Sequence, residues 1–143
     1  MSSNIEKYLK KRAVCGPWNL SPIPTRQFDN IVIIPAYAEF SYLFSTLDSI
    51  NKCTVDTFIE IMVVVVVNNE NGACNKVIRN NFKTLERLSK SRYSFFLSTI
   101  DASTSNLSIP VKSAGVGMAR KIGMDLSLNF AKSDSLLYCL DAD

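Results

Sequence analysis

Residues 57–67, "TFIEIMVVVVV", indicate the fold class more clearly than any other stretch of the chain. The last seven side chains of this run are all apolar, and no polar residue alternates with them. A strand without alternation is buried on both faces, which is typical of a central strand in a parallel sheet. The run therefore predicts a sheet that is covered by helices on its two sides.

The segments around this run alternate between strand and helix patterns. Short β-branched runs bounded by turn residues predict strands, and apolar residues at helical spacing predict amphipathic helices. The first strand is expected to stop at Pro35, because proline cannot donate to a strand ladder. The expected strands are residues 30–37, 57–67, 93–101 and 135–143, and the expected helices are residues 39–53, 74–91 and 114–131. This order predicts a three-layer α/β fold, with a mostly parallel sheet flanked by helices.

Two of the expected helices have a clear apolar side. The helix at 39–53 places Phe40, Leu43, Phe44, Leu47 and Ile50 together, and the helix at 74–91 places Val77, Ile78, Phe82, Leu85 and Leu88 together. We expect these sides to face the sheet. Residues 13–27 carry three of the five prolines, and we expect them to form an irregular lead-in.

The composition excludes several classes of function. The chain has 143 residues, enough for one domain, and its formal charge of +3 is too small to indicate binding to nucleic acid. It has no histidine, which excludes a histidine base, and its four cysteines form no C-x-x-C pair, so a zinc site is not expected. We expect free thiols in a reducing, cytoplasmic setting.

The start of the chain leaves two interpretations open. Residues 6–12, "EKYLKKR", contain four basic side chains and no apolar run of the kind that forms a signal peptide. The first interpretation is the solvated face of a short N-terminal helix. The second is a weak peripheral contact with an anionic membrane surface.

Candidate site residues gather where the strands are expected to end. Ligands of open parallel sheets bind beyond the carboxyl ends of the strands. Asp141 and Asp143 flank one alanine at the end of the last strand, and hard carboxylate oxygens suit Mg²⁺ or Mn²⁺ together with a phosphate. A strand that runs into a turn can also end in aspartate for structural reasons alone.

Two further segments have a functional and a structural interpretation. In "PAYAEF", residues 35–40, Tyr37 offers a ring for stacking, and Glu39 offers either a ligand or a helix N-terminal carboxylate. In "KSAGVGMARKIGMD", residues 112–125, Gly115, Ala119 and Gly123 recur every four residues, which lets a helix approach the sheet closely. Backbone N–H groups at the start of that helix could instead face an anion.

Four segments together resemble the N-terminal half of a family 2 glycosyltransferase of the GT-A fold. They are "IVIIPAYAEFSYLFSTLDSI" at 31–50, "VVVVVNNENG" at 63–72, "AGVGMARKIGMD" at 114–125 and "LLYCLDAD" at 136–143. The resemblance divides the chain into a lead-in at 1–30 and an incomplete nucleotide-sugar-binding subdomain at 31–143.

The resemblance implies a site for a nucleotide-diphospho-sugar, with a UDP-sugar as the expected donor. Pro35, Tyr37 and Glu39 would contact the nucleoside, and Asn68 would contact the base or ribose. Arg120 would lie near the nucleotide. Asp141 and Asp143 would contact the ribose and hold Mn²⁺ or Mg²⁺ against the diphosphate.

Three positions depart from the family pattern. Ala38 stands where asparagine is common, Asn68 and Asn69 replace an acidic residue, and Lys121 replaces an asparagine. The nucleotide preference is therefore open.

The family's acceptor pocket and catalytic carboxylate follow the D-x-D pair, and this sequence ends there. We expect little transferase activity from this chain alone, a frayed end at Asp143, and self-association through an unpaired last strand. Two rival interpretations are a haloacid dehalogenase-type phosphatase, whose D-x-D belongs on the first strand, and a non-catalytic α/β interaction module.

Overall fold

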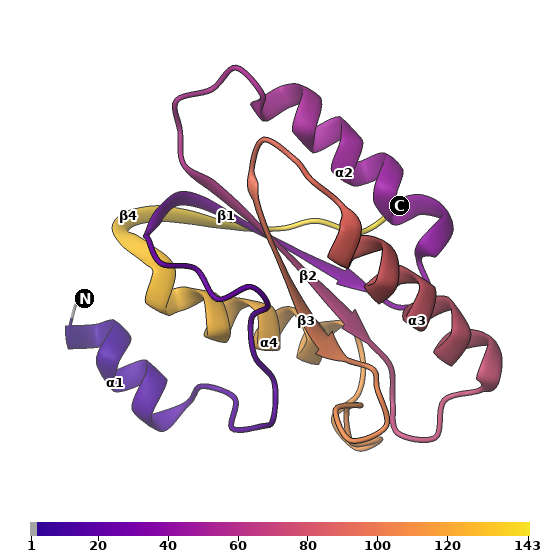
Figure 1. Ribbon diagram of the computed structural model, residues 1–143. Helices are drawn as coiled ribbons and strands as arrows, with labels where there is room; N and C mark the ends of the chain where they lie inside the picture. The colour runs from indigo at the N-terminus through magenta and orange to yellow at the C-terminus, as the bar shows by residue number, and fades with distance from the viewer. Residues whose placement is uncertain (1–2) are drawn as a thin grey trace.

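The computed structural model describes residues 3–143 and confirms the α/β fold class. Its four strands form an all-parallel sheet in the order β3-β2-β1-β4, with α2 and α3 on one face and α4 on the other (Figure 1). The elements are α1 (Ser3–Lys11), β1 (Phe28–Ala36), α2 (Phe40–Thr54), β2 (Ile61–Asn68), α3 (Asn75–Lys90), β3 (Phe96–Ala102), α4 (Val116–Ser127), a 3₁₀ turn (Leu128–Phe130) and β4 (Ala131–Cys139). Within residues 3–143, no helix has the length and apolar character needed to cross a bilayer.

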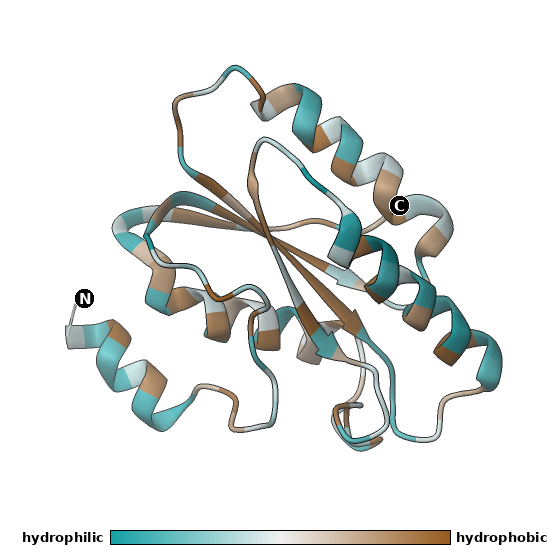
Figure 2. Ribbon diagram, in the orientation of Figure 1, coloured by the Kyte–Doolittle hydropathy of each residue, from teal (hydrophilic) through white to brown (hydrophobic). Residues whose placement is uncertain are grey.

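Strand β2 lies inside the sheet, as its apolar run predicts. Residues 62–67 are fully buried. Val63, Val65 and Val67 pack with α2 and α3, and the side chains between them pack with α4. Figure 2 shows this apolar centre, with hydrophilic residues on the outer sides of the helices. The strand begins at Ile61, so the first four residues of the expected run, 57–60, are a connecting loop.

Strand β1 begins earlier than expected and does not stop at Pro35. It runs from Phe28 to Ala36, and Pro35 pairs with Val66 of β2. The Leu140 N–H donates to the Ile33 carbonyl at 3.0 Å, so the backbone groups of Ile33 point toward the side of β4. Because strand geometry repeats every two residues, the backbone groups of Pro35 point to the same side. Because β4 ends at Cys139, the N–H that Pro35 lacks has no partner to lose.

The predicted apolar side of α3 is only partly confirmed as a prediction of burial, since Leu85 and Leu88 pack with the core but two other residues do not. Ile78 is 44% exposed and Phe82 is 67% exposed. Asn81 and Thr84 are buried instead, together with Leu88. In α2, by contrast, the predicted residues Leu43, Phe44 and Leu47 are buried.

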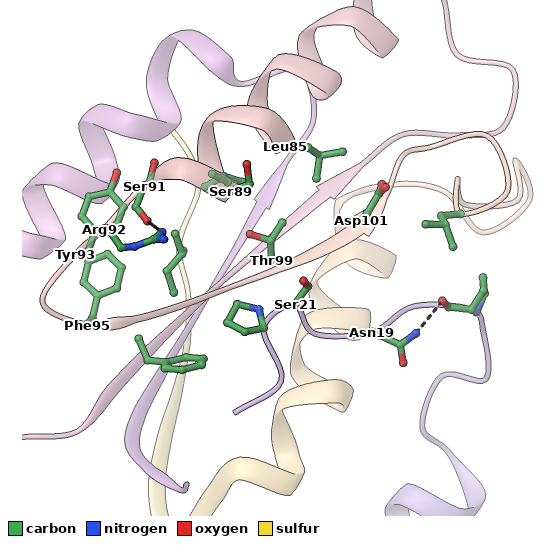
Figure 3. A pocket seen from close by; sticks show the side chains of 16 residues that line it. Asn19, Ser21, Leu85, Ser89, Ser91, Arg92, Tyr93, Phe95, Thr99 and Asp101 are labelled. Carbon is green, nitrogen blue, oxygen red and sulfur yellow. Dashed lines mark hydrogen bonds between the residues drawn. The ribbon is translucent and has the colours of Figure 1, made fainter. Parts of the chain in front are cut away.

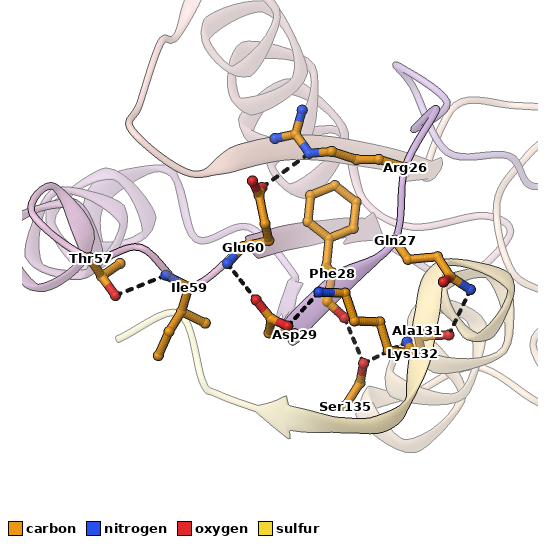
Figure 4. Close-up of polar contacts among 10 residues, drawn as sticks. All are labelled: Arg26, Gln27, Phe28, Asp29, Thr57, Ile59, Glu60, Ala131, Lys132 and Ser135. Carbon is orange, nitrogen blue, oxygen red and sulfur yellow. Dashed lines mark hydrogen bonds and ion pairs between the residues drawn. The ribbon is translucent and has the colours of Figure 1, made fainter.

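Polar contacts fasten the amino-terminal edge of the sheet (Figure 4). Asp29 accepts hydrogen bonds from Lys132 Nζ at 2.6 Å and from the Glu60 N–H at 2.8 Å. The hydrogen bond from Lys132 lowers the pKa of Asp29. Ser135 Oγ donates to the Phe28 carbonyl at 2.6 Å. These contacts tie the starts of β1, β2 and β4 together, and they explain why β4 begins at Ala131, four residues before the expected start.

The end of the chain leaves the sheet after β4 and turns toward α2 (Figure 1). Ala142 is buried, and its carbonyl accepts a hydrogen bond from Thr46 Oγ1 at 2.7 Å. Asp141 and Asp143 therefore lie beyond the strand rather than within it. The residue between them is anchored to α2 by this hydrogen bond.

Candidate functional site

A cleft of about 560 Å³ lies at the carboxyl-terminal edge of the sheet. This volume falls in the range of small-molecule sites, roughly 300–1,000 Å³. The cleft is lined by Pro35, Tyr37, Glu39, Asn68, Glu70, Val111, Ala114, Gly115, Val116, Asp141, Ala142 and Asp143. The structure thus brings together six of the seven candidate site residues, and the seventh, Arg120, contacts one of them.

The loop from β1 to α2 supplies Tyr37 and Glu39. The Tyr37 hydroxyl donates to Glu70 Oε1 at 3.2 Å, across the cleft wall formed by the β2–α3 turn. Glu39 occupies the position just before α2 but makes no side-chain capping hydrogen bond there. Its carboxylate is therefore available to the cleft.

The acidic side chains of the cleft influence one another. Removal from water raises the pKa of Glu39, and the negative charges of Asp143 and Asp141 raise it further. Bringing a cation between these groups would relieve that repulsion. Arg120 already offsets part of it, because its Nη2 lies 2.7 Å from Asp141 Oδ1.

The donor set suits a hard divalent cation in its chemistry. Asp141 and Asp143 offer carboxylate oxygens, the ligands that Mg²⁺ and Mn²⁺ prefer. Among residues 3–143, no group of three or more His, Cys, Asp or Glu side chains converges as a metal site. An ion held here would therefore take its other ligands from water and from substrate phosphates, as Mg²⁺ usually does.

Asn68 closes the floor of the cleft at the end of β2. Its side chain is nearly buried, and its Nδ2 donates to the Val66 carbonyl at 3.1 Å. This arrangement leaves Oδ1 as the group that can accept from a ligand. An amide oxygen can accept the N–H of a base, as the aspartate of the family pattern would, but without its charge.

The start of α4 forms the opposite wall. Gly115 has φ of 139°, a conformation that favours glycine, and a side chain there would meet nothing within 4 Å. Arg120 lies one turn further along α4, and its Nε is buried without a hydrogen-bond partner among the described residues. Lys121 does not point to the cleft. Its Nζ contacts Asp125 Oδ2 at 2.7 Å and Tyr8 Oη at 3.0 Å.

Sequence reasoning missed two residues of this region. Glu70 follows β2 in a segment that pairs with Ile109, and its carboxylate accepts from Tyr37. Asn81 was assigned to a helix on the strength of its apolar neighbours. Two adjacent asparagines inside an amphipathic helix, Asn80 and Asn81, were the available signal.

A second hollow, of about 700 Å³, lies along the outer edge of β3 (Figure 3). Its polar groups already have partners. Asp101 accepts from the N–H groups of Ser103 and Thr104, Arg92 donates to the Ser91 carbonyl, and Ser21 pairs with Thr99. The hydrogen bonds that Asp101 accepts outweigh the effect of its burial and lower its pKa. The carboxyl-edge cleft gathers several carboxylates, among which Asp141 pairs with Arg120 while Glu39 makes no capping hydrogen bond, and it is therefore the stronger candidate site.

Comparison of the chain with family models, with curated proteins and with solved structures gives no match. The functional argument therefore depends on the geometry of the cleft and on the motifs that line it.

Proposed function

We propose that this chain binds a nucleotide-diphospho-sugar, with a UDP-sugar as the first choice, and forms the donor-binding part of a glycosyltransferase. One observation carries the proposal. Six candidate residues from three separate segments of the sequence line a single cleft of about 560 Å³ at the carboxyl edge of a parallel sheet. This edge is where open α/β sheets bind their ligands.

The cleft residues divide into two groups by their chemistry. Tyr37 offers a ring, Pro35 an apolar surface and Asn68 an amide oxygen, and these groups suit the base and ribose. Asp141 and Asp143 offer carboxylates to a divalent ion, and Arg120 offers a positive charge beside Asp141. An ion bound there would offset the charge that develops on the departing nucleoside diphosphate.

The proposal assigns donor binding to this chain. Glu39 lines the cleft and makes no capping hydrogen bond, so its role in the proposal is to accept hydrogen bonds from the nucleoside. We assign no residue of the cleft to deprotonation of the acceptor hydroxyl. Transfer of the sugar is therefore proposed for the enzyme to which the donor half belongs.

The alternative is a non-catalytic interaction module. The observation that favours it is the surface of β4, where Leu136, Tyr138 and Leu140 are all exposed. An apolar strand at a sheet edge is a typical site for contact with another chain.

Titration calorimetry separates the two candidates. UDP, GDP and CDP should be titrated into the wild type with Mn²⁺ and again after chelation. We expect Mn²⁺-dependent binding of UDP, and a loss of at least about tenfold in affinity, or about 1.4 kcal/mol, in Asp143→Asn. Asp134→Asn is the matched control, since it removes an exposed carboxylate of β4 outside the cleft. The absence of nucleotide binding in the wild type would contradict the proposal and favour the module.

A further inference from the structure

We infer that Asn81 of α3 is the positioning residue of the cleft: it fixes the β1–α2 loop and the end of β2 at a set distance from each other. The functional meaning of this inference rests on the proposed nucleotide site, but its structural part can be tested without any ligand. Asn81 does not line the cleft itself and acts through the segments that do, among them the end of β2 at Asn68.

The amide of Asn81 connects two walls of the cleft. It is 1% exposed, so each of its polar atoms needs a protein partner. Its Nδ2 donates to the Asn68 carbonyl at 3.0 Å and to Asn69 Oδ1 at 2.9 Å. Its Oδ1 accepts from the Ala38 N–H at 2.9 Å. One side chain thereby uses both of its donors and its acceptor on the two segments that carry Asn68, Tyr37 and Glu39.

The contact with Ala38 matters because that residue has an unfavourable backbone conformation. Ala38 has φ of 54°, in the left-handed region that side chains other than those of glycine and asparagine rarely adopt. Tyr37 and Glu39 flank it, so its conformation determines the directions in which both point. Asn80 supports the same loop, since its Oδ1 accepts from the Phe40 N–H at 3.1 Å.

The orientation of α3 indicates that these contacts take precedence over apolar burial. Phe82 and Ile78 are exposed on this helix while Asn81 and Thr84 are buried. Leu85 and Leu88 still pack against the core, but a helix that served only to cover the sheet would turn Phe82 inward as well. The rotation that buries Asn81 is the one that brings its amide to Ala38, Asn68 and Asn69.

Hydrogen exchange of the free protein tests the inference directly. In Asn81→Leu the side chain keeps the same number and branching of heavy atoms and loses all three hydrogen bonds. We expect exchange of the Ala38 amide to rise at least about tenfold more than exchange of the β2 amides, because the loop then opens independently of the sheet. Thr84→Val is the matched control. Thr84 is equally buried on α3, and its hydroxyl donates within the helix to the Asn80 carbonyl. In this control, Ala38 should change in step with β2.

A second variant keeps the test decisive if Asn81→Leu does not fold. In Asn81→Asp the carboxylate can still accept from Ala38 but opposes the Asn68 carbonyl and Asn69 Oδ1. Burial among these acceptors raises the pKa of the introduced carboxyl above its unfolded value, so the penalty is full at high pH and fades as pH falls. We expect the backbone N–H of Asn69 to lose protection against exchange at pH 7 and to regain it on acidification. The backbone N–H of Ala38 should stay protected throughout.

The two parts of the inference have separate outcomes. The inference would be overturned if hydrogen exchange rose equally at Ala38 and in β2 in Asn81→Leu. It would also be overturned if exchange at Asn69 did not respond to pH in Asn81→Asp. Either result would show that Asn81 is only a core residue. Where the wild type binds UDP with Mn²⁺, Asn81→Leu should bind it about tenfold more weakly, and Thr84→Val should bind it normally. A wild type that binds no nucleotide refutes the proposed function, and the exchange data still decide the role of Asn81.

Discussion

A single hydrogen atom at position 123 determines how closely α4 can approach the sheet. A Cβ placed on Gly123 would lie 2.5 Å from Ile33 Cγ2 and 2.9 Å from Val66 Cγ2, both distances inside van der Waals contact. The spacing of Gly115, Ala119 and Gly123 predicted this close approach from the sequence. The same helix supplies Arg120 and the Gly115 wall of the cleft, so the packing of Gly123 also sets the position of the site.

We expect Gly123→Ala to lower the free energy of unfolding by about 1–3 kcal/mol, as overpacking of a core does. Gly117→Ala is the matched control, because a Cβ there meets nothing within 4 Å. Alanine is the better helix former by about 1 kcal/mol, so this control should be neutral or stabilising. Urea denaturation of both variants measures the difference. Equal stability of the two would show that α4 does not pack at the distance described.

At the same scale, the site residues could be predicted to different extents. Asp141, Asp143 and Glu39 are charged side chains at expected strand ends, and the rule for parallel sheets was sufficient to bring them to one edge. Asn81 could not be found this way. Its function comes from hydrogen bonds to segments that lie 12 or more residues away in the sequence, and periodicity carries no information about such partners.

At the scale of elements, periodicity predicted the existence of α2, α3 and α4 and of all four strands, in their order along the chain. It was only partly right for α3, where Leu85 and Leu88 pack inward but Phe82 is exposed and Asn81 is buried. It failed for the ends of strands. The continuation of β1 past Pro35 depends on where β4 leaves the sheet, and the start of β4 depends on contacts with Phe28 and Asp29. Both are properties of neighbouring strands rather than of the local sequence.

Helix α1 is attached to α4 by a buried carboxylate. Asp125 accepts from Tyr8 Oη at 2.8 Å, from the Val14 N–H at 2.8 Å and from Lys121 Nζ at 2.7 Å. The hydrogen bonds to Asp125 and Tyr8 raise the pKa of Lys121, so the cation is retained at neutral pH. Helix α1, the lead-in at Val14 and α4 therefore meet at one side chain.

We expect Asp125→Ala to lower the free energy of unfolding by about 2–3 kcal/mol. The substitution removes the acceptor of the Val14 N–H and the carboxylate partner of the Lys121 ammonium group. Trypsin should also cut the basic segment at 7–12 faster, since α1 would detach before the sheet unfolds. Tyr8→Phe removes one hydroxyl from the same cluster and should cost about 1 kcal/mol. Unchanged trypsin cleavage in Asp125→Ala would contradict this attachment.

At the scale of the whole molecule, the two edges of the sheet differ. The edge at β3 is partly covered, because residues of the lead-in pair with Thr99 and hydrogen-bond to Ser98. The edge at β4 presents Leu136 and Tyr138, which lie two residues apart on the strand and share one face of the sheet, and exposed Leu140 follows directly after the strand. An open apolar edge of this kind favours pairing with another chain.

We therefore expect the protein to self-associate at high concentration, as measured by sedimentation velocity. Tyr138→Lys should weaken the association at least about tenfold, because a charge at an edge strand opposes pairing. Phe82→Lys is the control, since Phe82 is also an exposed aromatic residue, 67% against 44% for Tyr138, but lies on α3, away from β4. A monodisperse monomer at high concentration, or equal weakening in both variants, would refute this prediction.

The central claim is that the carboxyl-edge cleft holds a nucleoside diphosphate through a divalent ion. Paramagnetic broadening of backbone amide signals by Mn²⁺ in the presence of UDP tests it most directly, because broadening falls steeply with distance from the ion. We predict that residues 37–39 and 141–143 broaden first, that residues 97–101 of β3 stay sharp, and that chelation restores every signal. Uniform broadening, or broadening centred on any other part of the chain, would contradict the account.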